Sequence, residues 1–182
     1  YPENTAPAQF LKQYSSHDDT VEIDSTFYAT PRESTVRNWR ERTPEHFIFT
    51  ATVPREITHE RVLLHAEESM EIFIEIMQWL GHKMGPLLLQ FPYFNKKAFL
   101  GPSPFLKRLE EFLMRFTAEV PLVVEVRNPT WIHRDLVEVV EGCGATLAWV
   151  DQGWMPKANE WLDRLESPGT KGSYFRFLGD RQ

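Results

Sequence analysis

The sequence of 182 residues contains one cysteine, so no disulfide can form within the chain and no cysteine-rich zinc site can be built. It contains no run of about 18 apolar residues, which a transmembrane helix requires. The N-terminal part also lacks the basic and apolar regions of a signal peptide. We therefore expect a chain that does not enter a membrane and that works in the reducing cytoplasm.

Motifs that hold phosphate or metal ions are missing as well. No glycine-rich turn follows the first strand-like segment, which argues against an open dinucleotide-binding sheet. The six histidines show neither the H-E-x-x-H nor the H-x-H spacing. The net charge of -6, with acidic and basic residues interspersed, does not favour nucleic acid as a partner. A small-molecule ligand is the partner that we expect, and the oligomeric state is left open.

The chain does contain enough apolar material for one substantial core, with 42% hydrophobic and 13% aromatic residues. Short strand-like segments alternate with segments of helical periodicity. The strands are predicted at residues 20–24, 47–52, 86–91, 121–126, 145–150 and 173–177. The helices are predicted at residues 5–14, 32–42, 66–81, 104–117, 134–141 and 159–165.

This alternation of strand and helix predicts an α/β fold with a parallel sheet covered by helices. The nearly continuous apolar runs GPLLLQFP and VPLVVEVR support it, because strands buried on both faces have this composition. One unit per 30 residues or so is close to the spacing of a (β/α)8 barrel, which needs roughly 250 residues. We predict a single TIM-barrel-like domain over residues 1–182, with two of the eight units missing in whole or in part. An open doubly wound sheet is the rival.

The first predicted strand places two carboxylates on one face. In TVEIDSTFYAT, Val21 and Ile23 alternate with Glu22 and Asp24, and side chains two residues apart point the same way along a strand. We expect Val21 and Ile23 to pack against helices, and both carboxylates to face the interior of the barrel near its carboxyl end.

Charged residues also close several of the other strands, at the face on which barrel enzymes build their sites. We predict that Glu22 and Glu125 form an acid/base pair and that Arg127 and Arg176 anchor an anionic group. The alternative is structural, with the two arginines merely neutralising two buried carboxylates, since an unpaired buried charge is costly.

His59 is the third candidate catalytic residue, although a lone histidine in a loop is often a packing or surface residue. Trp131 is either a platform for a ligand or an apolar lid on the next helix. A divalent metal fits Glu22, Asp24, His59, Glu125 and Asp151 chemically, but their spacing specifies none, and no cofactor is established. The predicted substrate contacts are Asp24, Tyr28, Gln90, Arg127, Trp131, Asp151 and Arg176.

Six ordered motifs cover nearly the whole chain: TVEIDSTFY, TP at residues 43–44, ITH at 57–59, GPLLLQFP at 85–92, VEVRNPTW at 124–131 and YFRFLG at 174–179. In order and spacing they resemble the YecE-like family, domain of unknown function 72. The resemblance implies a TIM barrel of unestablished activity, with one further strand before and one after the chain.

The chain differs from the family pattern at four positions. It has Asp24 where the family usually has Asn, Thr52 for Lys, Asn128 for His and Leu178 for His. We expect an enzyme that uses acid/base chemistry on a hydroxylated or phosphorylated small molecule. The alternatives are a metal-dependent phosphodiesterase or isomerase, by analogy with apurinic endonuclease and xylose isomerase barrels, and a non-catalytic ligand-binding protein. Whether the chain is an enzyme is left open.

Overall fold

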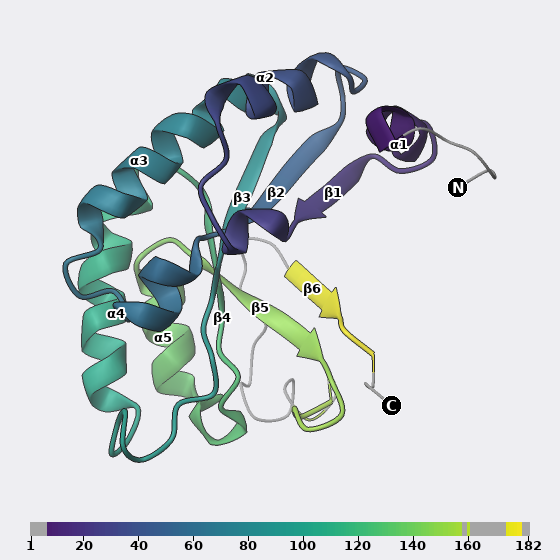
Figure 1. Cartoon of the computed structure of the whole chain (residues 1–182). Coiled ribbons are helices and arrows are strands. Elements are labelled where there is room, and N and C mark those ends of the chain that lie inside the picture. The colour runs from purple at the N-terminus through teal and green to yellow at the C-terminus, as the bar shows by residue number, and fades with distance from the viewer. Residues whose placement is uncertain (1–6, 158–159, 161–173, 180–182) are drawn as a thin grey trace.

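The computed structural model describes residues 7–157, 160 and 174–179. In this part of the chain, six parallel strands form one sheet in the order of the sequence (Figure 1). The strands are β1 (Thr20–Ile23), β2 (Ile48–Thr52), β3 (Met84–Gln90), β4 (Leu122–Glu125), β5 (Thr146–Asp151) and β6 (Tyr174–Phe177). The predicted strands are confirmed to within two residues at each end.

Helices cover the outer face of the sheet, where α2, α3, α4 and α5 form an arc in Figure 1. The α-helices are α1 (Pro7–Tyr14), α2 (Glu33–Glu41), α3 (Glu67–Met77), α4 (Ser103–Phe116) and α5 (Arg134–Gly142). Short turns are η1 (Ser25–Phe27), η2 (Glu56–Glu60), η3 (Gln78–Lys83) and η4 (Pro129–Trp131). Among the described helices, none is long and apolar enough to cross a membrane. The helix predicted at residues 159–165 lies outside the described residues, apart from Glu160.

Two helix ends differ from the prediction. α4 begins at Ser103, one residue before the predicted start at 104; Pro102 precedes it, and no side-chain hydrogen bond caps the helix. Gly81 was expected to end the helix at residues 66–81. Instead α3 ends at Met77, and a tighter turn continues to Lys83 through Gly81, whose φ of 61° lies in the left-handed region.

The alternation along each strand separates an outer from an inner apolar cluster. Leu87 and Leu89 belong to the main core between the sheet and the helices. Leu88 points to the opposite face, where it packs with Val123 and Ala148. The main core is far larger, so most of the apolar burial that stabilises the fold lies between the sheet and the helices.

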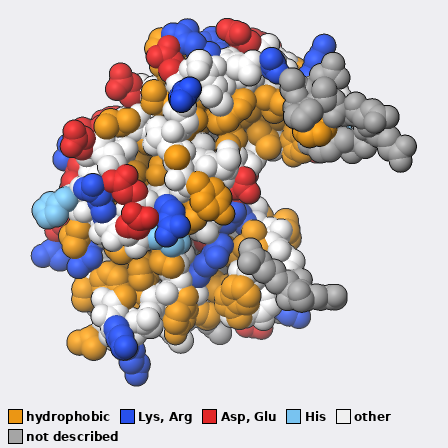
Figure 2. Space-filling view, viewed as in Figure 1, with side chains coloured by type: hydrophobic (Ala, Val, Ile, Leu, Met, Phe, Trp, Pro, Cys, Tyr) orange, Lys and Arg blue, Asp and Glu red, His pale blue; other side chains and the backbone are white. Residues whose placement is uncertain are grey.

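The sheet curves but does not close within the described residues. β1 and β6 are the two ends of the strand order, and they face each other across an open side in Figure 1. Figure 2 shows the molecule hollowed on one side. The described residues therefore form a parallel α/β half-barrel.

Candidate functional site

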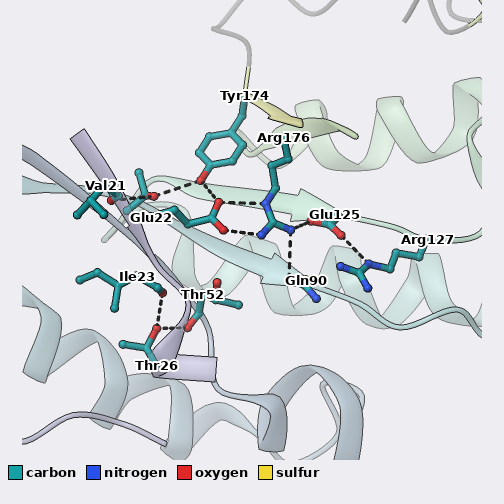
Figure 3. Close-up of polar contacts among 11 residues, drawn as sticks. Val21, Glu22, Ile23, Thr26, Thr52, Gln90, Glu125, Arg127, Tyr174 and Arg176 are labelled. Atoms are coloured by element: carbon teal, nitrogen blue, oxygen red, sulfur yellow. Dashed lines mark hydrogen bonds and ion pairs between the residues drawn. The ribbon is translucent and has the colours of Figure 1, made fainter. Parts of the chain in front are cut away.

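An ionic network lies on the inner face of the half-barrel, where Arg176 sits between two carboxylates (Figure 3). Its Nε donates to Glu22 Oε2 at 3.0 Å, and its Nη2 pairs with Glu22 Oε1. Its Nη1 pairs with Glu125 Oε2 and donates to Gln90 Oε1 at 3.2 Å. The network thus joins β1, β3, β4 and β6, and it commits most of the donors of Arg176.

Glu125 is the most deeply placed member, with a side chain that is 0% exposed. Its second oxygen accepts a hydrogen bond from Arg127 Nε at 2.8 Å, so each carboxylate oxygen faces a different guanidinium. Two such partners offset the cost of removing a carboxylate from water. The terminal nitrogens of Arg127 have no partner among the described residues, because its recorded bond uses Nε alone.

A cavity of about 440 Å³ lies beside this network, in the size range of small-molecule sites. Most of its lining comes from the carboxyl ends of strands and from the loops that follow them. The lining residues are Asp24, Phe27, Tyr28, Thr52, His59, Gln90, Arg127, Gln152, Trp154, Arg176 and Leu178.

The turn η1 and its two flanking residues contribute Asp24, Phe27 and Tyr28 to the lining. Thr26 is buried, and its hydroxyl lies 2.9 Å from the carbonyl oxygen of Ile23 and 2.7 Å from that of Thr52. These contacts hold the turn against the end of β2 (Figure 3). Asp24, just before the turn, has no side-chain capping bond and no recorded partner among the described residues. Its carboxylate is therefore available to a ligand.

His59 lies in η2 and is neutral at pH 7. Burial, followed by the nearby charges of Arg127 and Arg55, lowers its pKa to about 4. The ring contacts Phe27 edge to face at 4.9 Å between centroids, and Nδ1 lies 2.9 Å from the hydroxyl of Thr58. The ring is thus held in place as an uncharged imidazole on the cavity wall.

Two buried oxygens in the lining lack hydrogen-bond partners in the described part of the chain, namely Thr52 Oγ1 and Gln152 Oε1. Their residues are 1% and 8% exposed. A buried polar atom without a partner is destabilising by about 1–3 kcal/mol. Both residues also line the cavity, so either oxygen becomes a candidate for contact with a ligand when its side chain rotates toward the cavity.

The structure brings six of the predicted site residues to the cavity: Asp24, Tyr28, His59, Gln90, Arg127 and Arg176. Glu22 and Glu125 are joined through Arg176 but are not part of the lining. Glu22 and Asp24 both lie on the inner side near the carboxyl end of β1, as predicted, but β1 ends at Ile23, so Asp24 lies just beyond the strand rather than within it.

Trp131 and Asp151 do not reach the cavity. Trp131 is 8% exposed and stacks on Phe94, within a buried group that includes Phe99 and Phe105. Asn128 holds this loop, since its side-chain amide exchanges two hydrogen bonds with the backbone of Phe94. Asp151 ends β5 and is exposed, whereas the next residue lines the cavity.

Sequence reasoning missed several lining residues, namely Phe27, Thr52, Gln152, Trp154 and Leu178. Thr52 and Gln152 lie at the carboxyl ends of β2 and β5, so the rule that identified the charged residues could have found them. Trp154 has no comparable signal in the sequence, whereas Leu178 lies at a position where the family usually has His.

The fold and the cavity define a parallel β/α half-barrel with a polar pocket at the carboxyl ends of its strands. A family model described as "Protein of unknown function DUF72" matches residues 1–182, and this chain belongs to that family. The family resemblance drawn from the six motifs is therefore confirmed.

Relatives and solved structures agree with this placement. The UPF0759 protein YecE of Escherichia coli K12 is 34% identical over 124 residues, which cover 68% of this chain and 43% of that protein. The chain spans about half the length of the curated relatives it matches. A crystal structure of a DUF72 family protein from Thermotoga maritima has a TM-score of 0.66 and 28% identity, and the match covers 86% of this chain and 60% of that chain.

A more distant solved structure shows likeness of fold alone. It is a fusion protein of a xylose isomerase-like TIM barrel and a 4-hydroxyphenylpyruvate dioxygenase, with a TM-score of 0.52 and 14% identity. The match covers 81% of this chain and 25% of that chain. No specific activity is established for the family.

Proposed function

We propose that this chain forms the pocket of an enzyme that uses acid/base chemistry on a hydroxylated or phosphorylated small molecule. The observation that carries the proposal is the cavity itself. It brings together, at the carboxyl ends of parallel strands, a neutral imidazole and two groups without partners among the described residues, the carboxylate of Asp24 and the terminal nitrogens of Arg127. Acids, bases and orienting groups that converge from different elements are what proton transfer requires.

The proposal gives proton transfer to Asp24 and His59, because both line the cavity. Asp24 is the proton acceptor, since no partner among the described residues engages its carboxylate. His59, whose pKa of about 4 makes it a weak base at neutral pH, is the donor, because an uncharged imidazole carries a ring N–H. The terminal nitrogens of Arg127 orient the substrate. Glu22 and Glu125, which the sequence suggested as the acid/base pair, hold the arginines in position instead.

The test is turnover by the full-length protein on a panel of hydroxylated and phosphorylated metabolites, followed by kinetics of two variants. Asp24→Asn and His59→Gln should each lower kcat by about 100-fold or more while the fold is retained, the usual contribution of a positioned acid or base. Asp18→Asn is the matched control, since Asp18 is exposed and lies outside the cavity. An unchanged kcat in both cavity variants would refute the assignment.

A non-catalytic binding protein is the second candidate, favoured by the engagement of Glu22 and Glu125 with arginines. Mass spectrometry of the purified full-length protein separates the two. A ligand that is retained in the cavity and recovered unchanged after long incubation supports a binding protein. Recovery of a converted product supports the enzyme.

No step of the proposal uses a metal ion. In the described part of the chain, no three His, Cys, Asp or Glu side chains come close enough together to hold one. The oxygens of Glu22 and Glu125 also face guanidinium groups rather than an open site. A thermal shift of the full-length protein with Zn²⁺, Mn²⁺ or Mg²⁺ that is lost in Asp24→Asn would favour the metal-dependent alternative.

We also propose that the six strands belong to an eight-stranded (β/α)8 barrel within one domain. The curvature of the sheet and its likeness to the longer Thermotoga maritima chain support this. A structure of the full-length protein should show further strands paired with the free edges of β1 and β6. The single cysteine fits the cytoplasm as the compartment of the reaction.

A further inference from the structure

The positive charge beside the cavity is already balanced. Arg176 donates to Glu22 through Nε and Nη2, and to Glu125 through Nη1. Arg127 donates to Glu125 through Nε. The two guanidinium groups that line the cavity are therefore matched by two carboxylates directly behind them. An anionic ligand would find only the terminal nitrogens of Arg127 without a partner among the described residues, and these belong to a guanidinium whose charge Glu125 already balances.

The remaining charge in the lining is negative. The Asp24 carboxylate faces no cation among the described residues, and His59 contributes no positive charge at neutral pH. The pocket and the two glutamates behind it together contain two guanidinium groups and three carboxylates. A phosphorylated ligand brings further negative charge and would be repelled by this excess.

The unpartnered polar atoms call for a ligand that donates hydrogen bonds. Gln152 Oε1 is a buried acceptor without a donor in the described part of the chain, and the Asp24 carboxylate also only accepts when ionised. Thr52 Oγ1 can donate or accept, and it too lacks a partner there. A fully ionised phosphate supplies acceptors alone, whereas each hydroxyl group supplies a donor as well.

Aromatic rings complete the lining. Phe27, Tyr28 and Trp154 border the cavity, and the last two are 76% and 56% exposed. Large exposed rings beside polar groups suit a ligand with both apolar and polar surfaces. The C–H face of a sugar or cyclic polyol has this character, with hydroxyl groups around its edge.

We propose that the cavity binds an uncharged polyhydroxylated compound, of the monosaccharide or cyclic polyol class, in preference to its phosphorylated form. This inference rests on the proposed function, because it names the substrate class of the same pocket. The deciding features are the internal neutralisation of both arginines and the unpartnered oxygens of Thr52 and Gln152.

The test is saturation-transfer NMR on the full-length protein, which detects weak ligands. The probes are glucose, xylose and myo-inositol, each compared with its monophosphate, and inorganic phosphate alone. At least one neutral probe should bind with a Kd tenfold or more below that of its monophosphate. Gln152→Leu and Thr52→Val should each weaken that binding about tenfold, because a ligand hydroxyl loses its partner. Gln78→Leu, on the exposed face of η3, should leave it unchanged.

A variant of Asp24 tests whether the excess negative charge sets the preference for neutral probes. Asp24→Asn should narrow the preference for the neutral probe at least threefold by improving binding of the monophosphate, whereas Asp18→Asn should not change it. Tighter binding of the monophosphates to the unaltered protein, lost in Arg127→Met, would overturn the substrate class and leave the proposed pocket standing. If no probe of either series gives a signal that depends on Gln152, Thr52 or Arg127, the pocket proposal fails together with the inference.

Discussion

At the scale of single residues, Glu125 decides the arrangement of the charged groups. It has no exposed side-chain surface and touches both arginines that reach the cavity. Its removal would leave two guanidinium groups with fewer acceptors in a partly buried place. Residues of this kind set the geometry of a site without contacting its ligand.

We expect Glu125→Gln to destabilise the protein by about 3–5 kcal/mol, the usual effect of breaking a buried ion pair on one side. Urea unfolding of the full-length protein measures it. Glu138→Gln is the control, because Glu138 pairs with Arg134 on an exposed helical surface and should contribute less than about 1 kcal/mol. Equal losses of unfolding free energy in Glu125→Gln and Glu138→Gln would show that the network around Arg176 contributes no more than an exposed ion pair.

The lowered pKa of His59 predicts that the stability of the protein depends on pH. The folded state holds its pKa at about 4, below the ordinary value of 6.5, so the unfolded chain binds more protons between these values. The neutral imidazole therefore makes its full contribution to the free energy of unfolding above pH 6.5, and this contribution is lost as the pH falls toward 4. We expect the free energy of unfolding to fall by about 1–2 kcal/mol over this window, after allowance for the partial exposure of the ring.

The measurement is urea unfolding of the protein and of His59→Gln at pH 7 and at pH 4.5. The free energy of unfolding of the unaltered protein should fall more between pH 7 and pH 4.5 than that of His59→Gln, because the variant lacks the titrating group. Parallel changes in the two proteins would contradict the lowered pKa, which NMR titration of the ring checks directly.

At the scale of elements, the close approach of β2 and β3 depends on Gly85. A Cβ atom at this position would lie 2.7 Å from Ile48 Cγ2 and 2.9 Å from the backbone oxygen of Phe49. The register between the two strands also shifts between Phe49 and Ala51. The strand pair therefore has no room for a side chain at this point.

We expect Gly85→Ala to destabilise the protein by about 1–3 kcal/mol, because backbone atoms must move to relieve the overlap. Gly101→Ala should have little effect, since nothing lies within 4 Å of a Cβ atom there. Thermal unfolding of the two variants compares them. Similar melting temperatures for Gly85→Ala and Gly101→Ala would mean that β2 and β3 can accommodate the extra methyl group without a loss of stability.

At the scale of the whole molecule, Tyr174 connects the two ends of the sheet. Its hydroxyl donates to Glu22 Oε2 at 2.6 Å and lies 3.2 Å from the hydroxyl of Thr50. β6 is thereby tied to β1 and β2 across the interior of the half-barrel. Burial, followed by the bond to Glu22, raises the pKa of the phenol, so it remains a donor at all ordinary pH values.

We expect Tyr174→Phe to cost about 1.5–3 kcal/mol, the range for a hydrogen bond to a charged group. Hydrogen exchange of the β6 amides should also become faster, because β6 pairs only with β5 among the described strands. Tyr93→Phe, an exposed residue outside the cavity, is the control. Unchanged exchange in β6 would show that the contact across the interior does not hold the strand.

Local patterns in the sequence are sufficient to predict the helices, the strands and the face of the sheet that carries the site. Apolar runs and helical periodicity depend on local side-chain pattern, so all six strands and the helices α1 to α5 could be predicted. The carboxyl ends of parallel strands meet at one edge, which was enough to bring Arg127 and Arg176 into one site.

The roles of the individual site residues could not be predicted from the sequence, because they depend on tertiary packing. Whether Glu125 faces a ligand or an arginine depends on side chains from β1, β4 and β6 that are remote in sequence. Trp131 looked like a ligand platform, but three phenylalanines from another loop and helix bury it. Thr52 and Gln152 are candidates because each has a buried oxygen with no hydrogen-bond partner in the part of the chain that the structure describes. Burial and pairing are properties of the packed molecule, and no local pattern of residues contains them.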